Sequence, residues 1–318
     1  MSGDTQVKIR IADITLAVVG LTRDWVWVDR EPFEPYLSDG PEDVVLRLHA
    51  GRVSRGIPPG DLVSSAEGLR NVYLGEETWA VDFHPYLRAL YPQRPPYQVL
   101  VFDRRFTSGD LYVSGDTVSE RPVLSLGLFL LDLLTDMLPF HYGMMLHAAG
   151  ICEDGQAIIL AGPSGAGKST LAGLWRGTAG VRVLNDDRIV LRRKKSRWWA
   201  YPVPTFGDLR SESPDGVPVK AAFVIQHAGE NRGRRIGSAE TATSLLPHIA
   251  LPSYDAVAVD LDLELLEDLA EGVPAYELGF LPDQTAVDFV RDLVRRGIGE
   301  HGLDGRPSED LEQCRIGS

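Results

Sequence analysis

The residues best suited to chemistry form one short, glycine-rich segment in the middle of the chain. The pattern G-x-x-x-x-G-K-[ST] is matched without exception by Gly162, Pro163, Ser164, Gly165, Ala166, Gly167, Lys168 and Ser169. Small residues let consecutive backbone N–H groups turn inward around a chain of phosphates. We expect Lys168 to bring positive charge to the outer phosphates. The Ser169 hydroxyl should ligate Mg²⁺, and Thr170 should help to orient that hydroxyl.

The segments on either side of this loop predict the elements that must hold it. Residues 157–160 are apolar and partly β-branched, which is typical of a buried parallel strand. Residues 170–175 read as the start of a helix, whose dipole would point its positive end at bound phosphates. The alternative is a glycine-rich turn that matches by chance. Strand, loop and helix in this order favour nucleotide binding.

Two adjacent carboxylates form the second chemical element. Asp186 and Asp187 follow Lys168 by about twenty residues and come directly after the apolar segment 181–184. Carboxylates at the end of a core strand can hold Mg²⁺ or take a proton from an attacking hydroxyl, and two of them can divide these tasks. The alternative is an Asx turn that ends the strand and leaves both side chains in solvent.

His147 is the third element. It lies in a predicted strand, residues 145–151, which an Asp154-Gly155 turn joins to the strand that leads into the loop. A histidine there could donate to a phosphoryl oxygen or share charge in the transition state. The alternative is a buried histidine bonded to a backbone carbonyl. The hairpin itself predicts a mixed sheet, because a wholly parallel sheet has no such neighbour.

Composition narrows the class of protein. The 318 residues carry a net charge of −13, which argues against nucleic acid or an anionic membrane as the main partner. Cys152 and Cys314 have no metal-ligand spacing, so we expect a reducing compartment. Residues 1–10 lack the apolar core of a signal sequence, and the apolar stretch 123–134 is too short and interrupted to span a bilayer. We expect a cytoplasmic protein.

The order of the segments predicts a β-rich N-terminal domain (1–120), a catalytic domain (121–297) and a flexible tail (298–318). Strands of a mainly antiparallel layer are predicted at 7–11, 25–29, 44–49, 71–74 and 97–102. The catalytic domain should open with a helix at 122–140. Later strands are predicted at 181–184, 189–192, 198–201 and 219–225, and later helices at 241–249, 262–270 and 284–296. The basic run 192–197 should be a solvated hairpin tip, or else a dock for an acidic partner.

Three segments in this order resemble the core of the HPr kinase/phosphorylase family: residues 146–150, 159–171 and 184–187. The resemblance extends over about residues 140–295. It implies the α/β, phosphoenolpyruvate carboxykinase-like fold, in which a mixed sheet carries the phosphate loop. Here a smaller β-rich domain precedes that core.

The resemblance also implies roles for individual residues. Gly162 to Thr170 would bind the nucleotide phosphates, with Lys168 on the β/γ side and Ser169 on Mg²⁺. One of Asp186 and Asp187 would be the base and the other a metal partner, and the family pattern favours Asp187 as base. His147 matches the family's active-site histidine. Arg210 lies where the family places a mobile substrate loop, 205–210, and could stabilise the transferred charge. A solvated loop arginine is the alternative.

Departures from the family pattern limit what is carried over. Ala148 replaces a glycine, and no E-x-R-G segment lies between Asp187 and Thr205. The chain therefore resembles a divergent relative. We expect an ATP- and Mg²⁺-dependent kinase for a serine-like hydroxyl of a peptide, protein or small metabolite. Its N-terminal domain would recognise the acceptor or form a homo-oligomer contact. The alternative is a nucleotide-binding regulatory module or slow ATPase without an acceptor.

Overall fold

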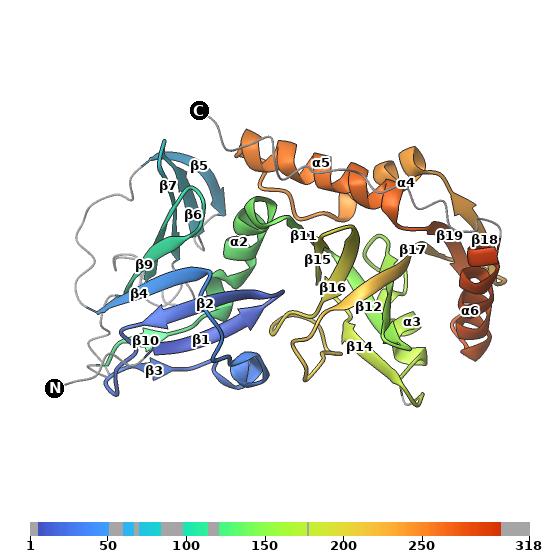
Figure 1. Ribbon diagram of the computed structural model, residues 1–318, viewed down its shortest axis with the longest axis horizontal. Coiled ribbons are helices and arrows are strands. Elements are labelled where there is room, and N and C mark those ends of the chain that lie inside the picture. Colours follow the sequence, from blue (N-terminus) through green and yellow to red (C-terminus); the bar gives the residue numbers. More distant parts are fainter. Residues whose placement is uncertain are drawn as a thin grey trace.

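The computed structural model describes residues 6–50, 60–66, 70–83, 98–113, 121–176 and 178–299. Figure 1 shows two lobes: the N-terminal strands lie on the left, the strands from β11 onward lie on the right, and α5 (Ala256–Gly272) runs along the top. The fold is mixed α/β with a β-rich N-terminal region, in agreement with the predicted class. No described helix is long and apolar enough to cross a membrane.

The N-terminal lobe is built on one sheet with the strand order β1-β2-β4-β9-β8-β7-β6-β5. The pairs β2–β4 and β4–β9 are parallel and the other five are antiparallel, so a mainly antiparallel layer is confirmed. The strands are β1 (Gln6–Ile11), β2 (Ile14–Val19), β4 (Val44–Ala50), β5 (Asp61–Ala66), β6 (Arg70–Leu74), β7 (Thr78–Phe83), β8 (Gln98–Asp103) and β9 (Ser108–Val113).

The strand predicted at 25–29 is shorter in the structure, because only β3 (Val26–Trp27) pairs, in parallel, with β10 (Val123–Leu124). Of the strand predicted at 97–102, Tyr97 lies outside the described residues and the rest belongs to β8. Beside β3 lies the short 3₁₀ helix η1 (Glu31–Tyr36).

The helix predicted at 122–140 begins later than expected. Val123 and Leu124 are in β10, and α2 spans only Gly127–Met137 before the 3₁₀ helix η2 (Leu138–His141). The reason is a distant cap: the carboxylate of Asp29 accepts hydrogen bonds from the backbone N–H groups of Leu126 (3.1 Å) and Gly127 (2.7 Å). These amides have no partner within the helix, so Asp29 sets where it starts.

The second lobe is built on a mixed sheet that contains the predicted hairpin. Strands β12 and β13 are antiparallel and are joined by Asp154 and Gly155, both with positive φ, as a tight hairpin turn requires. The pairs β13–β17 and β17–β19 are parallel. The strands are β11 (Gly143–Leu146), β12 (Ala148–Glu153), β13 (Gln156–Ala161), β14 (Val181–Asn185), β15 (Ile189–Lys194), β16 (Arg197–Tyr201), β17 (Val217–His227), β18 (Arg232–Ile236) and β19 (Ala275–Phe280).

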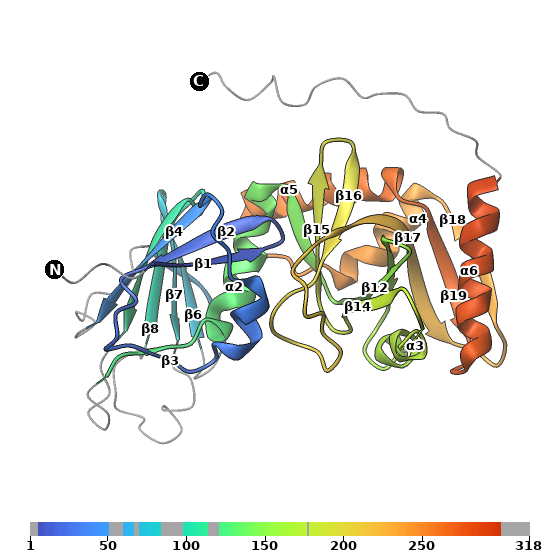
Figure 2. The same ribbon diagram turned by 60° about the horizontal axis from the view of Figure 1, so that its bottom comes forward.

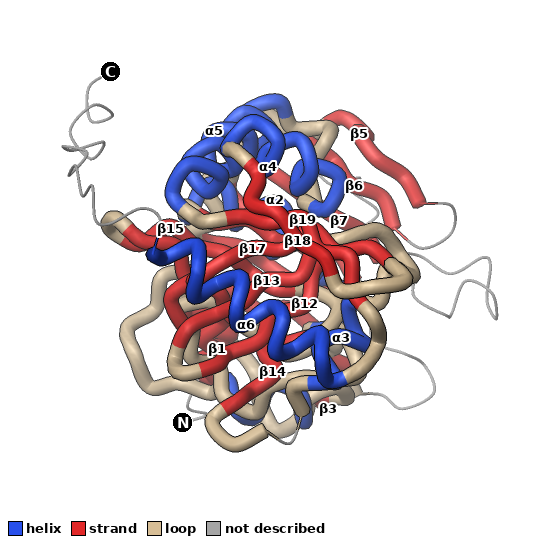
Figure 3. Tube along the Cα trace, turned by 90° about the vertical axis from the view of Figure 1, so that its right-hand side faces the viewer, coloured by secondary structure: helices blue, strands red, loops and turns tan. Residues whose placement is uncertain are grey.

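Helices cover both faces of this sheet. Leu245 of α4 and Leu266 of α5 belong to the buried cluster on one face, and Leu171 of α3 and Val290 of α6 belong to the cluster on the other. Figure 3 shows α4 and α5 together on one side of the strands, away from α3 and α6. The helices are α3 (Lys168–Leu174), α4 (Ser238–Leu245) followed by the 3₁₀ helix η3 (Leu246–His248), α5, and α6 (Gln284–Gly299). The predicted helices are found, but α5 begins already at Ala256.

The basic run at 192–197 is a hairpin tip, as predicted, and its residues 194–197 are exposed. It forms the β15–β16 hairpin, but its side chains hold other elements. Arg192 donates to the carbonyl oxygen of Ala12 (2.7 Å), and Lys194 donates to a carboxylate oxygen of Asp13 (2.6 Å). Arg193 donates to Asp268 of α5 (2.6 Å). These cations therefore join the two lobes and the covering helix.

The two lobes share one apolar core. The cluster that fills the N-terminal sheet continues through α2 into Met145, Val190, Tyr201 and Val203 of the second lobe. In Figure 2, the segment between β16 and β17 lies between β14 and the N-terminal lobe. Arg10 of β1 forms an ion pair with Asp215 of that segment (2.7 Å). The N-terminal lobe therefore lies beside the segment that connects β16 to β17, two strands of the sheet that carries the phosphate loop. The division at residue 121 stays a prediction.

Candidate functional site

One edge of the second sheet gathers the three predicted elements. Strands β13 and β14 both pair antiparallel with β12, so the carboxyl ends of β13 and β14 and the start of β12 meet at the same edge. The glycine-rich loop follows β13, Asp186 and Asp187 follow β14, and His147 directly precedes β12. Hairpin topology therefore brings together segments that lie up to 40 positions apart in the sequence, from 147 to 187.

The loop at 162–167 has a backbone that needs glycine at three positions. Gly165 and Gly167 have φ of 79° and 93°, which L side chains rarely adopt. A Cβ on Gly167 would lie 2.8 Å from Cζ of Phe280, and one on Gly162 would lie 2.8 Å from the carbonyl oxygen of Ile225. The loop therefore lies tightly against the ends of β17 and β19.

The first turn of α3 leaves backbone donors at the mouth of this loop. Leu171 is the first residue whose N–H bonds within the turn, to the carbonyl of Gly167 (2.8 Å). The N–H groups of Lys168, Ser169 and Thr170 come before it and have no partner inside the helix. Ser169 and Thr170 are exposed. Unpaired amides at this place are suited to phosphate oxygens.

Lys168 folds back across the loop. Its Nζ donates to the carbonyl oxygens of Gly162 (2.8 Å) and Pro163 (3.2 Å), and the residue is 7% exposed. Burial lowers the pKa of Lys168, and the nearby charge of Asp187 opposes that shift. The ammonium group therefore bonds to the loop carbonyls and lies near enough to Asp187 to be affected by its charge.

Asp187 is the carboxylate that faces the loop. One of its oxygens, Oδ1, lies 3.4 Å from Nδ1 of His147, and Oδ2 lies 3.5 Å from Nε of Arg188. Burial lowers the pKa of His147, Lys168 and Arg188 lower it further, and Asp187 opposes them. A histidine with a pKa below its usual 6.5 is mainly neutral at pH 7. The site thus combines a carboxylate, a neutral imidazole and an ammonium group.

Asp186 points to a different segment. Its Oδ1 accepts a hydrogen bond from the N–H of Leu209 (3.0 Å), and the residue is 5% exposed. A Cβ on Gly207 would collide with that oxygen, so the loop 205–210 approaches it closely. Asp186 therefore anchors the loop, and its role toward Mg²⁺ stays a prediction.

Arg210 lies on the side of the loop that faces the N-terminal lobe. Its Nη1 donates to the carbonyl of Pro204 (3.4 Å), and its side chain is exposed. Burial raises the pKa of Tyr36 in η1, and the charges of Arg182 and Arg210 oppose that shift, so these arginines lie near Tyr36. Within the part of the chain that the structure describes, no contact joins Arg210 to Asp187. The guanidinium group beside Asp187 belongs to Arg188.

Two histidines at this edge were missed in the sequence. The backbone carbonyl of His248, at the end of η3, accepts a hydrogen bond from the N–H of His147 (2.7 Å). Burial lowers the pKa of His248, and the charges of Lys168 and His147 lower it further. His227, at the end of β17, contacts the carbonyl oxygen of Gly165 (2.7 Å). Neither histidine belongs to a motif, and only the parallel pairing of β17 with β13 could have indicated His227.

Metal ligands are few. Among the described residues, no group of three or more histidine, cysteine, aspartate or glutamate side chains is placed to hold a metal ion. A magnesium ion here would need oxygens from Ser169, one aspartate, water and a bound phosphate. That set is typical of Mg²⁺, which retains water and shares substrate phosphates.

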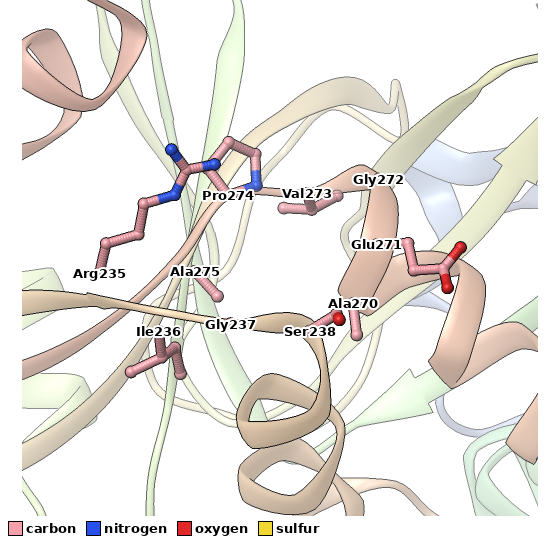
Figure 4. A pocket seen from close by; sticks show the side chains of 10 residues that line it. All are labelled: Arg235, Ile236, Gly237, Ser238, Ala270, Glu271, Gly272, Val273, Pro274 and Ala275. Carbon is pink, nitrogen blue, oxygen red and sulfur yellow. The ribbon is translucent and has the colours of Figure 1, made fainter. Parts of the chain in front are cut away.

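A cavity of about 670 Å³ lies elsewhere, and Figure 4 shows its lining. It is lined by residues that include Arg235 at the end of β18, Ser238 at the start of α4, Glu271 at the end of α5 and Ala275 at the start of β19. Because β19 is parallel to β17 and β17 to β13, the start of β19 is at the opposite end of the sheet from the phosphate loop. No predicted site residue lines this cavity.

Comparison with known proteins finds likenesses to a family model and to solved structures. The family model described as SynChlorMet cassette protein ScmC matches residues 122–261. Among solved structures, the Hpr(Ser) kinase/phosphatase from Coxiella burnetii matches with 14% sequence identity and a TM-score of 0.29, over 49% of this chain and 99% of that one. Comparison with the curated proteins gives no match.

Proposed function

We propose that this chain is an ATP- and Mg²⁺-dependent kinase that transfers the γ-phosphate to a hydroxyl group. The observation that carries the proposal is the convergence of Lys168, His147 and Asp187 at one edge of the sheet. An ammonium group, a neutral imidazole and a carboxylate beside unpaired loop amides are the groups that phosphoryl transfer needs. We also propose that the core is of the phosphoenolpyruvate carboxykinase-like type, supported by the antiparallel β12 beside the loop strand.

Binding of the nucleotide would fall to the loop Gly162–Thr170. The N–H groups at the start of α3 would donate to phosphate oxygens, and Nζ of Lys168 would exchange the carbonyls of Gly162 and Pro163 for the β- and γ-phosphates. Mg²⁺, held by Ser169 and Asp186, would neutralise charge on the phosphate oxygens. Asp186 would keep its hydrogen bond to Leu209, because a carboxylate has lone pairs for both.

Asp187 would act as the base. As the acceptor oxygen bonds to the γ-phosphorus, the bond from that phosphorus to the β–γ bridging oxygen breaks, and the hydroxyl proton passes to a carboxylate oxygen of Asp187. The products are the phosphorylated acceptor and ADP. His147 and Arg188, on either side of that carboxylate, would keep it turned toward the acceptor.

The acceptor would approach along the loop 205–210, which Asp186 anchors and whose Arg210 lies near Tyr36 of the N-terminal lobe. Arg210, exposed on this loop, would contact the acceptor or the transferred group. We assign the N-terminal lobe to acceptor recognition because η1 brings Tyr36 close to Arg182 and Arg210. The acceptor is then a peptide, protein or metabolite with a serine-like hydroxyl.

The test distinguishes transfer of the γ-phosphate to an acceptor from simple hydrolysis of ATP. The chain is incubated with Mg²⁺ and ATP labelled at the γ-phosphate, together with a panel of serine-bearing peptides and small alcohols. A kinase labels one class of acceptor faster than it releases inorganic phosphate. Slow release of phosphate alone, unchanged by any acceptor, would support the regulatory module or slow ATPase instead. Failure to bind ATP would contradict both functions.

A further inference from the structure

We propose that His227 is a positioning residue for the phosphate loop, holding Gly165 so that the loop is already shaped for phosphates before a nucleotide binds. This inference rests on the proposed nucleotide site. His227 touches the loop's backbone and none of the reacting groups, so its effect would be on binding and not on the transfer step.

The topology of the sheet delivers His227 to the loop. Strand β17 is the parallel neighbour of β13, with Val224 opposite Ala161, the last residue of β13. While β13 turns into the loop, β17 continues for three more residues and ends at His227. Parallel neighbours reach the same edge of a sheet, so the longer strand runs alongside the loop. The position of His227 is therefore fixed by pairing and does not depend on a flexible connection.

The hydrogen bond has only one possible direction. Nε2 of His227 lies 2.7 Å from the carbonyl oxygen of Gly165. A carbonyl oxygen accepts and cannot donate, so the proton must be on Nε2. The imidazole also stacks on Phe280, its register partner in β19, with ring centroids 6.0 Å apart and an angle of 28° between the rings. The stack fixes the plane of the ring and aims its N–H at the loop.

Together with a backbone hydrogen bond, this bond fixes the peptide unit between Gly165 and Ala166. The carbonyl of Gly165 and the N–H of Ala166 belong to the same planar trans peptide and point in opposite directions. The N–H of Ala166 donates to the carbonyl of Pro163 (3.1 Å), so His227 and Pro163 hold the two ends of that unit. Fixing this peptide fixes the direction in which the loop turns.

Side-chain packing cannot supply the same restraint at this point. A Cβ built on Gly165 would meet no atom within 4 Å, so the tip of the loop stands in open space. Its positive φ is accessible to glycine but is not enforced by it. Farther along, a Cβ on Gly167 would lie 2.8 Å from Phe280 and 3.3 Å from Cε1 of His227, so these two rings leave room only for glycine at that position. Hydrogen bonds must therefore define the tip.

Three substitutions separate the hydrogen bond from the stacking. His227→Phe keeps an aromatic ring on Phe280 but has no N–H, His227→Gln keeps an N–H donor without the ring, and His227→Ala lacks both. We expect Ala and Phe to raise the Kd for Mg-ATP by about three- to tenfold, the factor of one hydrogen bond of ordinary net strength. The Gln variant should have a Kd within about twofold of that of the unsubstituted chain. The KM for ATP should follow the Kd while kcat at saturating ATP stays unchanged.

The same variants are compared without nucleotide by amide hydrogen exchange of the peptide 162–168. Ala and Phe should speed exchange of the Ala166 amide by a similar factor, and Gln should not. The matched control is His49→Ala, which removes another exposed histidine with a 2.7 Å hydrogen bond, to Asp110 on the N-terminal sheet. This control should change neither measurement.

The two measurements keep this inference apart from the proposed function. If the Phe variant matches the unsubstituted chain in exchange, or if Gln is as fast as Ala, the hydrogen bond of His227 does not position the loop. If exchange responds as expected but the unsubstituted chain does not bind Mg-ATP, the nucleotide function fails while the positioning role stands. A Kd that rises for Gln and Ala but not for Phe would assign His227 to ring stacking and overturn the hydrogen-bond account.

Discussion

At the scale of single residues, Asn185 decides where Asp187 points. It is fully buried, and its Oδ1 accepts hydrogen bonds from the N–H groups of Asp187 (2.8 Å) and Arg188 (3.0 Å). Its Nδ2 donates to the carbonyl of Phe206 (3.0 Å). An Asx turn therefore does end β14, as the alternative reading of the sequence held. However, it is Asn185 that forms this turn. The turn buries Asp186 and directs Asp187 toward the phosphate loop.

Replacing Asn185 by alanine should damage both stability and the site. Two backbone donors and one acceptor would lose their partner in a buried place, so the free energy of unfolding should fall by about 2 kcal/mol. Asp187 would lose its orientation, and ATP turnover per folded molecule should fall at least about tenfold. Denaturant unfolding and turnover check this. Asn71→Ala, which removes hydrogen bonds in the N-terminal sheet, should leave turnover per folded molecule unchanged. Equal turnover in both variants would contradict the role of Asn185.

The residues that could be predicted are those whose position follows from local chain geometry. The phosphate loop is one example, because its glycines and Lys168 lie in a single continuous segment of the chain. His147 is another, because the Asp154-Gly155 turn fixes the hairpin register. His227 and His248 arrive from strands and turns far away in the sequence, and Arg188 faces Asp187 only because Asn185 bends the chain. No spacing rule could reveal these three.

At the scale of elements, chain reversals and caps explain what the sequence missed. The hairpin of β1 and β2 turns at Ala12 and Asp13, both with positive φ, and neither is the glycine or asparagine that usually marks such a turn. Tyr201 (2.8 Å) and Lys194 (2.6 Å) of the other lobe hold the Asp13 carboxylate. The cost of this backbone conformation is offset by tertiary contacts. β2 was therefore not predicted, and neither was the start of α2.

The cap of α2 can be tested directly. Asp29→Ala removes the acceptor for the N–H groups of Leu126 and Gly127 and for the hydroxyl of Ser125 (2.8 Å). We expect the free energy of unfolding to fall by about 2 kcal/mol, the upper range for a helix cap. Denaturant unfolding measures it. Asp24→Ala, at an exposed position of the same connection, should cost less than about 0.5 kcal/mol. Similar losses in the two variants would show that Asp29 is not the cap.

At the scale of the whole molecule, acidic side chains are buried where the two lobes meet. Asp136 of α2 and Asp262 of α5 are 2% and 1% exposed. Burial raises the pKa of Asp136 to about 7 and that of Asp262 to about 8, and in each case a second aspartate adds to the shift. Tyr254 donates to Asp136 (2.7 Å), while Oδ1 of Asp262 has no hydrogen-bond partner among the described residues. Arg104 pairs with Asp255 nearby (2.8 Å).

These two carboxyls should make the fold less stable as the pH rises. Between about pH 4, where they ionise in the unfolded chain, and their folded pKa values of about 7 and about 8, the folded chain holds more protons. Stability therefore falls with rising pH, by up to about 1.4 kcal/mol per unit for each carboxyl. Asp262→Asn should flatten this dependence between pH 5.5 and 8, measured by denaturant unfolding. Asp260→Asn, exposed on the same helix, should not. An unchanged slope in Asp262→Asn would contradict the buried-acid account.

The most direct test of the central claim compares Asp187→Asn with the unsubstituted chain in two measurements on the same sample. Titration with Mg-ATP should give about the same Kd, because the phosphates would be bound by the loop amides and Lys168 and not by Asp187. Turnover of γ-labelled ATP at saturation should fall by about 10²- to 10⁴-fold, the usual contribution of a general base. Asp154→Asn, at the far end of the β12–β13 hairpin, should match the unsubstituted chain in both. The account predicts an unchanged Kd for Mg-ATP together with a strongly reduced rate of turnover. An Asp187→Asn protein that turns over ATP at the unsubstituted rate would contradict it.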